Sequence, residues 1–189
     1  MDYLLGLIIL LIKIAAMLGG LLLGASYLVW LERKFLARLQ IRRGPNRAGI
    51  FGLLQPIADA VKLLTKEDIV PDQADGFLFR LAPAVVAVTA MLMFAVVPIG
   101  PDLQIFGRAV PMLISDLNVG LLFVFALSSL GVYGVALGGW ASNSKFALLG
   151  GIRGAAQMIS YELALGLALV PVVMLAGSFS LTAIVDAQA

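Results

Sequence analysis

Four long apolar segments constrain the fold of this 189-residue chain more than any other feature. A helix needs about 20 mostly apolar residues to cross the hydrocarbon of a bilayer. Four segments meet that length, at 4–30, 78–98, 119–139 and 155–177. They lack the alternating polarity of membrane β-barrel strands. The sequence therefore predicts an all-α fold, a polytopic transmembrane helical bundle with four spans in a single membrane domain over residues 1–189.

The residue types that are missing exclude several kinds of chemistry. The chain contains no cysteine and no histidine. Without them it has no thiolate or imidazole metal ligands, no histidine haem ligand and no cysteine ligands for an iron–sulfur cluster. It also lacks nucleophile–base pairs built on Cys or His. We therefore expect no metal site, no redox centre and no catalytic residue in this chain.

The basic residues predict how the chain is oriented. Eight of the thirteen lie in the segment 31–77, and the segment 140–154 holds Lys145 and Arg153. Loops enriched in Lys and Arg remain in the cytoplasm. The segments 31–77 and 140–154 are therefore predicted to be cytoplasmic, and the N-terminus is predicted to be periplasmic. Basic charge beside membrane spans indicates orientation, and we expect no nucleic-acid partner.

The first apolar run is expected to persist as a membrane helix. No basic residue precedes it, and it is longer than the apolar region of a signal peptide.

The first cytoplasmic segment begins with a charged helix exit followed by a basic turn. Residues 32–38 are expected to continue the first helix out of the membrane. The turn at 42–49 contains Gly-Pro-Asn and a later Gly, which is strong turn punctuation. Three arginines in this turn indicate a site for an anion or a polar head group, or a docking surface. Binding of lipid phosphate is the alternative.

An amphipathic helix is predicted over Leu53–Lys66, in the same cytoplasmic segment. Pro56 suits its first turn, and apolar residues recur at helical spacing. Asp59, Lys62 and Lys66 lie three and four residues apart, on another face. The helix could lie on the bilayer surface with a self-neutralising polar face. Alternatively, that face lines a cavity in which it binds a polar head group or passes protons.

The fourth apolar run carries polar residues near its start. Arg153, Gln157 and Tyr161 follow one another at intervals of four and form a polar stripe, with Glu162 beside it. A charged residue at bilayer depth costs at least ~2.5–3.5 kcal/mol on insertion scales. Glu162 could reach the interface or remain protonated. We favour a proton-relay carboxylate that faces a hydrated bundle interior.

Glycines also recur at four-residue spacing within the apolar runs. The pairs are Gly20 and Gly24, Gly134 and Gly138, and Gly150 and Gly154. Small residues at this spacing allow helix backbones to approach closely. We interpret them as ordinary helix packing.

Several ordered motifs along the chain resemble those of one protein family. They are Glu32–Lys34, Arg42–Arg47, Gly52–Glu67, Lys66–Asp68, Gly139–Lys145 and Arg153–Glu162. Through them the chain resembles the H subunit of bacterial NADH–quinone oxidoreductase, which forms the heel of the membrane arm of respiratory complex I. That family normally has eight spans, so the resemblance covers its N-terminal half.

The resemblance implies a role in proton-pumping quinone reduction. It implies that Arg33, Arg42, Asp59 and Lys62 contribute to a quinone chamber, and that proton or charge coupling involves Glu32, Asp59, Glu67 and Glu162. The substrate would be ubiquinone or menaquinone, and partner subunits would hold FMN and iron–sulfur clusters. Implied partners are the peripheral-arm subunits of the quinone site, neighbouring membrane-arm subunits and membrane lipid. The location would be the bacterial inner membrane, and the chain alone is expected to be inactive.

Three other functions stay open on the residues alone. The first is a membrane subunit of an energy-converting hydrogenase, which needs no quinone. The second is a small-solute transporter or channel subunit. The third is a scaffold without polar chemistry, in which removal of Asp59 or Glu162 would leave turnover unchanged. The subunits that co-purify with the chain would separate the first alternative from the quinone enzyme.

Overall fold

The computed structural model describes residues 2–105 and 108–188. Residue contacts divide the chain into two compact units, 1–69 and 70–189. The predicted single domain over 1–189 therefore stays a prediction, and its residues 1, 106, 107 and 189 lie outside the described ones.

Four helical segments within the described ranges are long and apolar enough to cross a membrane, as predicted. They are Gly6–Leu39, Gly76–Val96, Gly120–Ala141 and Lys145–Ala176.

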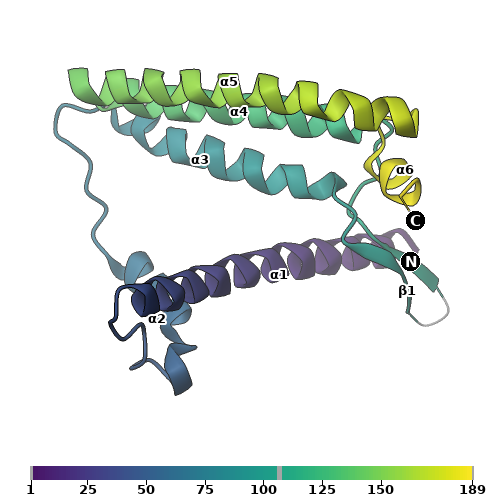
Figure 1. Cartoon of the computed structure of the whole chain (residues 1–189), viewed down its shortest axis with the longest axis horizontal. Coiled ribbons are helices and arrows are strands. Elements are labelled where there is room, and N and C mark those ends of the chain that lie inside the picture. Colours follow the sequence, from purple (N-terminus) through teal and green to yellow (C-terminus); the bar gives the residue numbers. More distant parts are fainter. Residues whose placement is uncertain (1, 106–107, 189) are drawn as a thin grey trace. The chain divides into compact units, whose positions relative to one another are not determined.

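The first unit contains one long helix and a short one. Helix α1 (Asp2–Leu39) has 38 residues, so at 1.5 Å per residue it is about 57 Å long. A bilayer core is about 30 Å thick. The charged C-terminal part of α1 therefore continues past the apolar run, as the sequence predicts. Figure 1 shows α1 as one long helix. The 3-10 turn η1 (Ile50–Gly52) and helix α2 (Gln55–Thr65) follow.

Helix α1 ends in a strained backbone turn. The N–H of Arg42 donates to the carbonyl of Ala37 at 2.8 Å, and the N–H of Ile41 donates to the carbonyl of Arg38 at 3.1 Å. These two bonds form a Schellman motif, whose left-handed position is usually a glycine. Here Ile41 occupies it, with φ 53°. Because Ile is β-branched, this conformation stores strain at the start of the basic turn.

Helix α2 confirms the predicted amphipathic helix, with Pro56 in its first turn. It ends at Thr65, and Lys66 has extended backbone angles. The helix is therefore shorter than the predicted Leu53–Lys66, by two residues at its start and one at its end, and a polar face that includes Lys66 stays a prediction. Asp59 and Lys62 remain on the helix.

The second unit is built from three long helices. They are α3 (Gly76–Met93), α4 (Gly120–Ala141) and α5 (Lys145–Ala176), and α4 packs against both of the others (Figure 1). A Cβ placed on Gly134 would lie 2.8 Å from the carbonyl oxygen of Ala82, so α3 and α4 touch through backbone here. The predicted close packing is therefore confirmed at Gly134. Gly20, Gly24 and Gly150 have open space around them instead.

Three features of the second unit differ from the sequence-based expectation. Helix α5 begins at Lys145, so the predicted loop 140–154 is largely helical. Its first turns were missed because glycines and Arg153 lower the local hydropathy, whereas Gly151 packs against the backbone of Gly139. The predicted span 78–98 ends earlier as regular α-helix, at Met93, and continues as the 3-10 turn η2 (Phe94–Val96).

The third difference is a hairpin between α3 and α4. Strands β1 (Gly100–Ile105) and β2 (Arg108–Met112) pair antiparallel, with Gln104 opposite Ala109. The prolines in this segment argue against strands, which is why pattern reasoning missed them. The short helix α6 (Leu181–Asp186) follows α5 and is capped by Ser180, whose side chain accepts from the N–H of Ala183.

Candidate functional site

The exit of α1 is tied to α2 by an ion pair. Arg33 Nη1 donates to Asp59 Oδ2 at 2.6 Å, across 26 residues of sequence. Gln55 Nε2 donates to the other carboxylate oxygen, Oδ1, at 2.9 Å. The two charged side chains are partly exposed, at 50% for Arg33 and 34% for Asp59. Asp59 thus holds one side chain from each helix.

The partners of Asp59 stabilise its ionised form. The hydrogen bond from Gln55 lowers the pKa of Asp59 most, and the hydrogen bond from Arg33 follows. Desolvation opposes these two hydrogen bonds more weakly, and the charges of Arg33 and Lys62 lower the pKa further by still smaller amounts. Asp59 therefore remains a carboxylate at neutral pH, where it can accept hydrogen bonds but cannot donate one.

A cavity lined by arginines lies beside this ion pair. It has a volume of about 720 Å³. Gly52, the last residue of η1, packs against the basic turn. It has φ 77°, and the backbone of Pro45 occupies the space where a side chain would stand. Only glycine fits such a position without strain. The residues that line the cavity are Arg33, Arg42, Arg43, Gly44, Pro45, Asn46, Arg47 and Gln55.

Charge in this cavity is strongly one-sided. Of its four arginines, Arg33 is paired with Asp59, and Arg42 Nε donates to the side-chain oxygen of Gln40 at 2.7 Å. Among the described residues, no carboxylate lines the cavity. The arginines provide N–H donors and no acceptors, so the cavity suits a ligand that carries carbonyl or anionic oxygens.

An aromatic contact holds the same region together. Lys34 Nζ lies 4.7 Å from the centre of the Trp30 ring and 5.3 Å from that of Phe51. A cation over an aromatic face is attracted by the ring quadrupole. Lys34 therefore joins α1 to η1, one residue after the arginine that joins α1 to α2.

A second cavity contains Glu162, in the other compact unit. It is an apolar groove of about 700 Å³ between α4 and α5. Glu162 projects from α5, and Ser129 Oγ on α4 lies 2.9 Å from its Oε1. Glu162 is the only charged residue among the described ones that line the groove. The lining residues are Phe125, Ser129, Val132, Tyr133, Ala136, Ala155, Ile159, Glu162, Leu163, Gly166 and Leu167.

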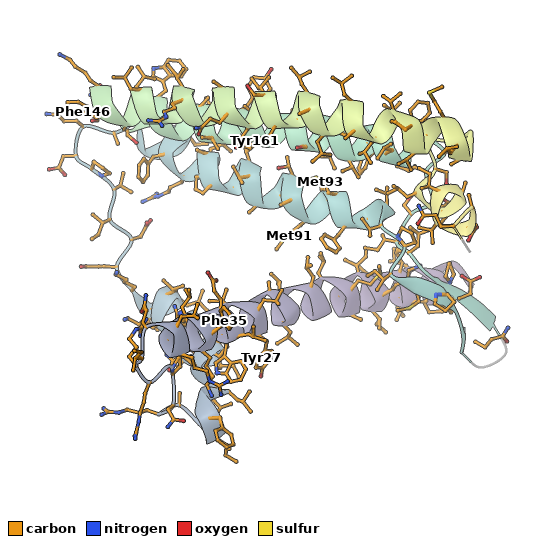
Figure 2. All side chains as sticks on the ribbon, in the orientation of Figure 1. Tyr27, Phe35, Met91, Met93, Phe146 and Tyr161 are labelled. Atoms are coloured by element: carbon orange, nitrogen blue, oxygen red, sulfur yellow. The ribbon has the colours of Figure 1, made fainter. Side chains whose placement is uncertain are left out.

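The predicted polar stripe occupies a different surface of α5. Arg153, Gln157 and Tyr161 line a shallow depression of about 340 Å³ together with Ala156 and Ser160. All three stripe side chains are exposed, and Figure 2 shows Tyr161 on α5. The three side chains thus share one depression on α5, while Glu162 lies in the groove toward α4, and the role predicted for the stripe stays a prediction.

The structure brings together part of the predicted site. Arg33, Asp59 and Arg42 lie around one ion pair and its neighbouring cavity. The charge of Lys62 lowers the pKa of Asp59, but Lys62 does not line that cavity. Glu32 and Glu67 are exposed and line none of the three cavities above. The roles predicted for all these residues stay predictions.

Sequence reasoning missed two polar residues of these sites. Gln55 stands four residues before Asp59 on α2, and that spacing alone could have identified the pair. Ser129 contacts Glu162 across 33 residues of sequence. Only the packing of α4 on α5 brings these two side chains together, so no local pattern could have found Ser129.

Comparison with known proteins is consistent with these features. A family model described as NADH dehydrogenase matches residues 12–189. The chain is 70% identical to an H subunit of NADH-quinone oxidoreductase from Syntrophobacter fumaroxidans, over 97% of this chain and 55% of that protein. It is 64% identical to the H subunit of NADH-quinone oxidoreductase from Syntrophotalea carbinolica, over 99% of this chain and 57% of that protein. The chain thus spans about half the length of these curated relatives.

Proposed function

The chain belongs to the family of NADH–quinone oxidoreductase H subunits, and from that premise we propose that it serves in the membrane arm of that proton-pumping enzyme. In this proposal it forms part of the quinone chamber and couples quinone reduction to proton movement. The observation that carries the proposal is the arginine-lined cavity beside the Arg33–Asp59 pair, at the charged exit of an apolar helix. Support also comes from the names of the relatives and from the four apolar helices.

The cavity suits the chemistry of a quinone. The quinone head carries two carbonyl oxygens on an otherwise apolar molecule, so it needs N–H donors at the edge of an apolar phase. Arg42 and its neighbours supply such donors, and α1 leaves the apolar segment beside them. Asp59 accepts hydrogen bonds from Arg33 and Gln55 and thereby holds in place two of the side chains that line the cavity.

The redox step itself needs partner subunits. NADH supplies two electrons and is oxidised to NAD⁺, and the quinone takes up two electrons and two protons to become the quinol. FMN and iron–sulfur clusters in partner subunits would carry the electrons, since this chain has no Cys or His. This chain's part is to bind the head group and to respond to the change in local charge.

Glu162 is the proposed proton-relay carboxylate. It stands in an apolar groove, with Ser129 as its hydrogen-bonding neighbour. A carboxyl group in such surroundings is costly and is usually functional. The exposed stripe Arg153, Gln157 and Tyr161 lies on the same helix and is proposed to extend the polar path toward water.

Two substitutions in the assembled oxidoreductase test the proposal. Arg42→Ala should raise the apparent KM for quinone by roughly tenfold, because one charge-assisted hydrogen bond is lost. Arg38→Ala is the matched control, since Arg38 is an exposed arginine that does not line the cavity. An equal KM for both variants and the unmodified enzyme would assign the basic turn to lipid contact instead.

Glu162→Gln addresses the coupling step. It keeps the size of the side chain and removes its proton exchange, so proton pumping per NADH oxidised should fall. Assembly is checked by the subunit composition of the purified complex. Normal pumping in a fully assembled Glu162→Gln enzyme would reject the relay role.

A further inference from the structure

Ser129 forms two hydrogen-bonding contacts that its single hydroxyl proton cannot serve together. Its Oγ lies 3.0 Å from the carbonyl oxygen of Phe125, one turn earlier on α4, and 2.9 Å from Glu162 Oε1 on α5. A serine hydroxyl has one donor and two acceptor positions. Both contacts are complete only when one of the two other oxygens carries a proton itself.

Only Glu162 can carry that proton, because a backbone carbonyl has none. With Glu162 protonated, its O–H donates to Ser129 Oγ, and Ser129 donates to the carbonyl of Phe125. With Glu162 ionised, the hydroxyl turns and donates to the carboxylate. The carbonyl of Phe125 then loses only this additional contact, since it still accepts the helical N–H.

The surroundings leave Ser129 as the main polar partner of this carboxyl group. The other residues that line the groove are apolar, except for Tyr133 on α4. On the other side of α4, Thr89 of α3 faces Gly131, and its hydroxyl donates to carbonyls of its own helix. The proton state of Glu162 is therefore coupled chiefly to the rotation of one hydroxyl.

We propose that Ser129 is a positioning residue for Glu162, whose hydroxyl reverses its hydrogen bond each time the carboxyl group gains or loses a proton. The inference rests on the proposed relay role of Glu162. The hydroxyl moves no net charge and forms no covalent bond. It holds one carboxyl oxygen of Glu162 against α4 in both proton states, so that the proton enters and leaves at a fixed position.

The test uses the assembled oxidoreductase with the variants Ser129→Ala, Ser129→Thr, Glu162→Gln and the double variant Ser129→Ala with Glu162→Gln. Ser129→Ala should reduce proton pumping by about two- to tenfold, the range expected for one lost hydrogen bond. Ser129→Thr retains the hydroxyl and should restore pumping. In the double variant, the loss of Ser129 should add nothing to the effect of Glu162→Gln. Ser26→Ala is the control, since Ser26 makes the same bond to a carbonyl four residues earlier, at 2.7 Å to Leu22.

Infrared difference spectroscopy gives a readout that a merely structural role would not change. The carbonyl stretching band of protonated Glu162 is identified by its loss in Glu162→Gln. Ser129→Ala should move that band to higher frequency, and Ser129→Thr should return it. If Glu162→Gln abolishes pumping while Ser129→Ala leaves band and pumping unchanged, the inference is wrong and the relay stands. If Glu162→Gln itself pumps normally, the proposed function fails and the inference fails with it.

Discussion

A close approach of two helices, at Gly134, gives a stability prediction that the structure makes quantitative. An added Cβ at this position would lie 2.5 Å from Val86 Cγ2 and 2.8 Å from the carbonyl oxygen of Ala82. A relaxed carbon–oxygen contact is about 3.3 Å or longer, so α3 and α4 must separate by roughly half an ångström. Val86 can change its rotamer, but the Ala82 carbonyl is backbone and moves only with its helix. The overpacking at Gly134→Ala alone should therefore cost the unit about 1–3 kcal/mol, before any gain in helix propensity is counted.

Two glycines on the same helix are matched controls. A Cβ on Gly131 would meet Thr89 Oγ1 at 3.5 Å, and one on Gly138 would meet the Ala82 Cβ at 3.5 Å, which are ordinary contacts. Replacement by alanine also raises helix propensity by about 1 kcal/mol at all three positions. That gain cancels when the variants are compared with one another. Gly134→Ala should thus be less stable than Gly131→Ala and Gly138→Ala by about 1–3 kcal/mol, or roughly 5- to 150-fold in the unfolding constant.

The assay is denaturant unfolding of the purified chain in mild detergent, followed by helical circular dichroism. Val86→Ala combined with Gly134→Ala should recover only part of the loss, because the contact with the Ala82 carbonyl remains. If all three alanine variants had the same stability, or if Val86→Ala restored it fully, the inferred backbone contact between α3 and α4 would be refuted.

Two further predictions concern the first unit. Because the pKa of Asp59 is lowered in the folded chain, its ion pair contributes to stability above the ordinary aspartate pKa and loses that contribution as pH falls through the folded value. Asp59→Asn should therefore lower the stability of the chain at neutral pH and leave it equal to that of the unmodified chain in strong acid. The exposed control Asp72→Asn should not show this pH dependence. Parallel curves of stability against pH for Asp59→Asn and the unmodified chain would contradict the prediction. Ile41→Gly should raise stability by about 1 kcal/mol, since it removes the strain of a β-branched residue at φ 53°; unfolding midpoints test it, and an unchanged or lower midpoint would show that Ile41 is not strained.

The parts of the fold that sequence predicts are those determined by local hydropathy and local spacing. Helix α2 was predictable because Pro56 and its apolar residues follow helical spacing within a few turns. The early start of α5 at Lys145 was not, because its first turns are held by glycine packing against Gly139. The hairpin of β1 and β2 also escaped, since prolines in this segment conceal its strand pattern.

In the candidate sites, too, local sequence predicts some contacts, whereas others are created only by folding. The charges of Arg33 and Asp59 marked both residues as candidates, but they stand 26 residues apart, so only the folded turn between them creates the pair. Gln55 was within reach of a local rule, as one helical turn separates it from Asp59. Ser129 could not be identified from the sequence, because an isolated serine in an apolar helix has no distinguishing pattern.

The two cavities differ in the kind of chemistry that their side chains allow. The arginine cavity contains permanent charges and lies beside an aspartate whose partners keep it ionised, so its charge stays constant near neutral pH. It can bind and orient a polar head group, but it is poorly suited to exchange protons. The groove at Glu162 has one carboxyl group, a rotating hydroxyl and otherwise mostly apolar walls, so a proton gained or lost there is weakly screened. Because binding needs fixed charge and coupling needs a changeable one, the proposed enzyme requires both sites, and a variant of either should impair a different step.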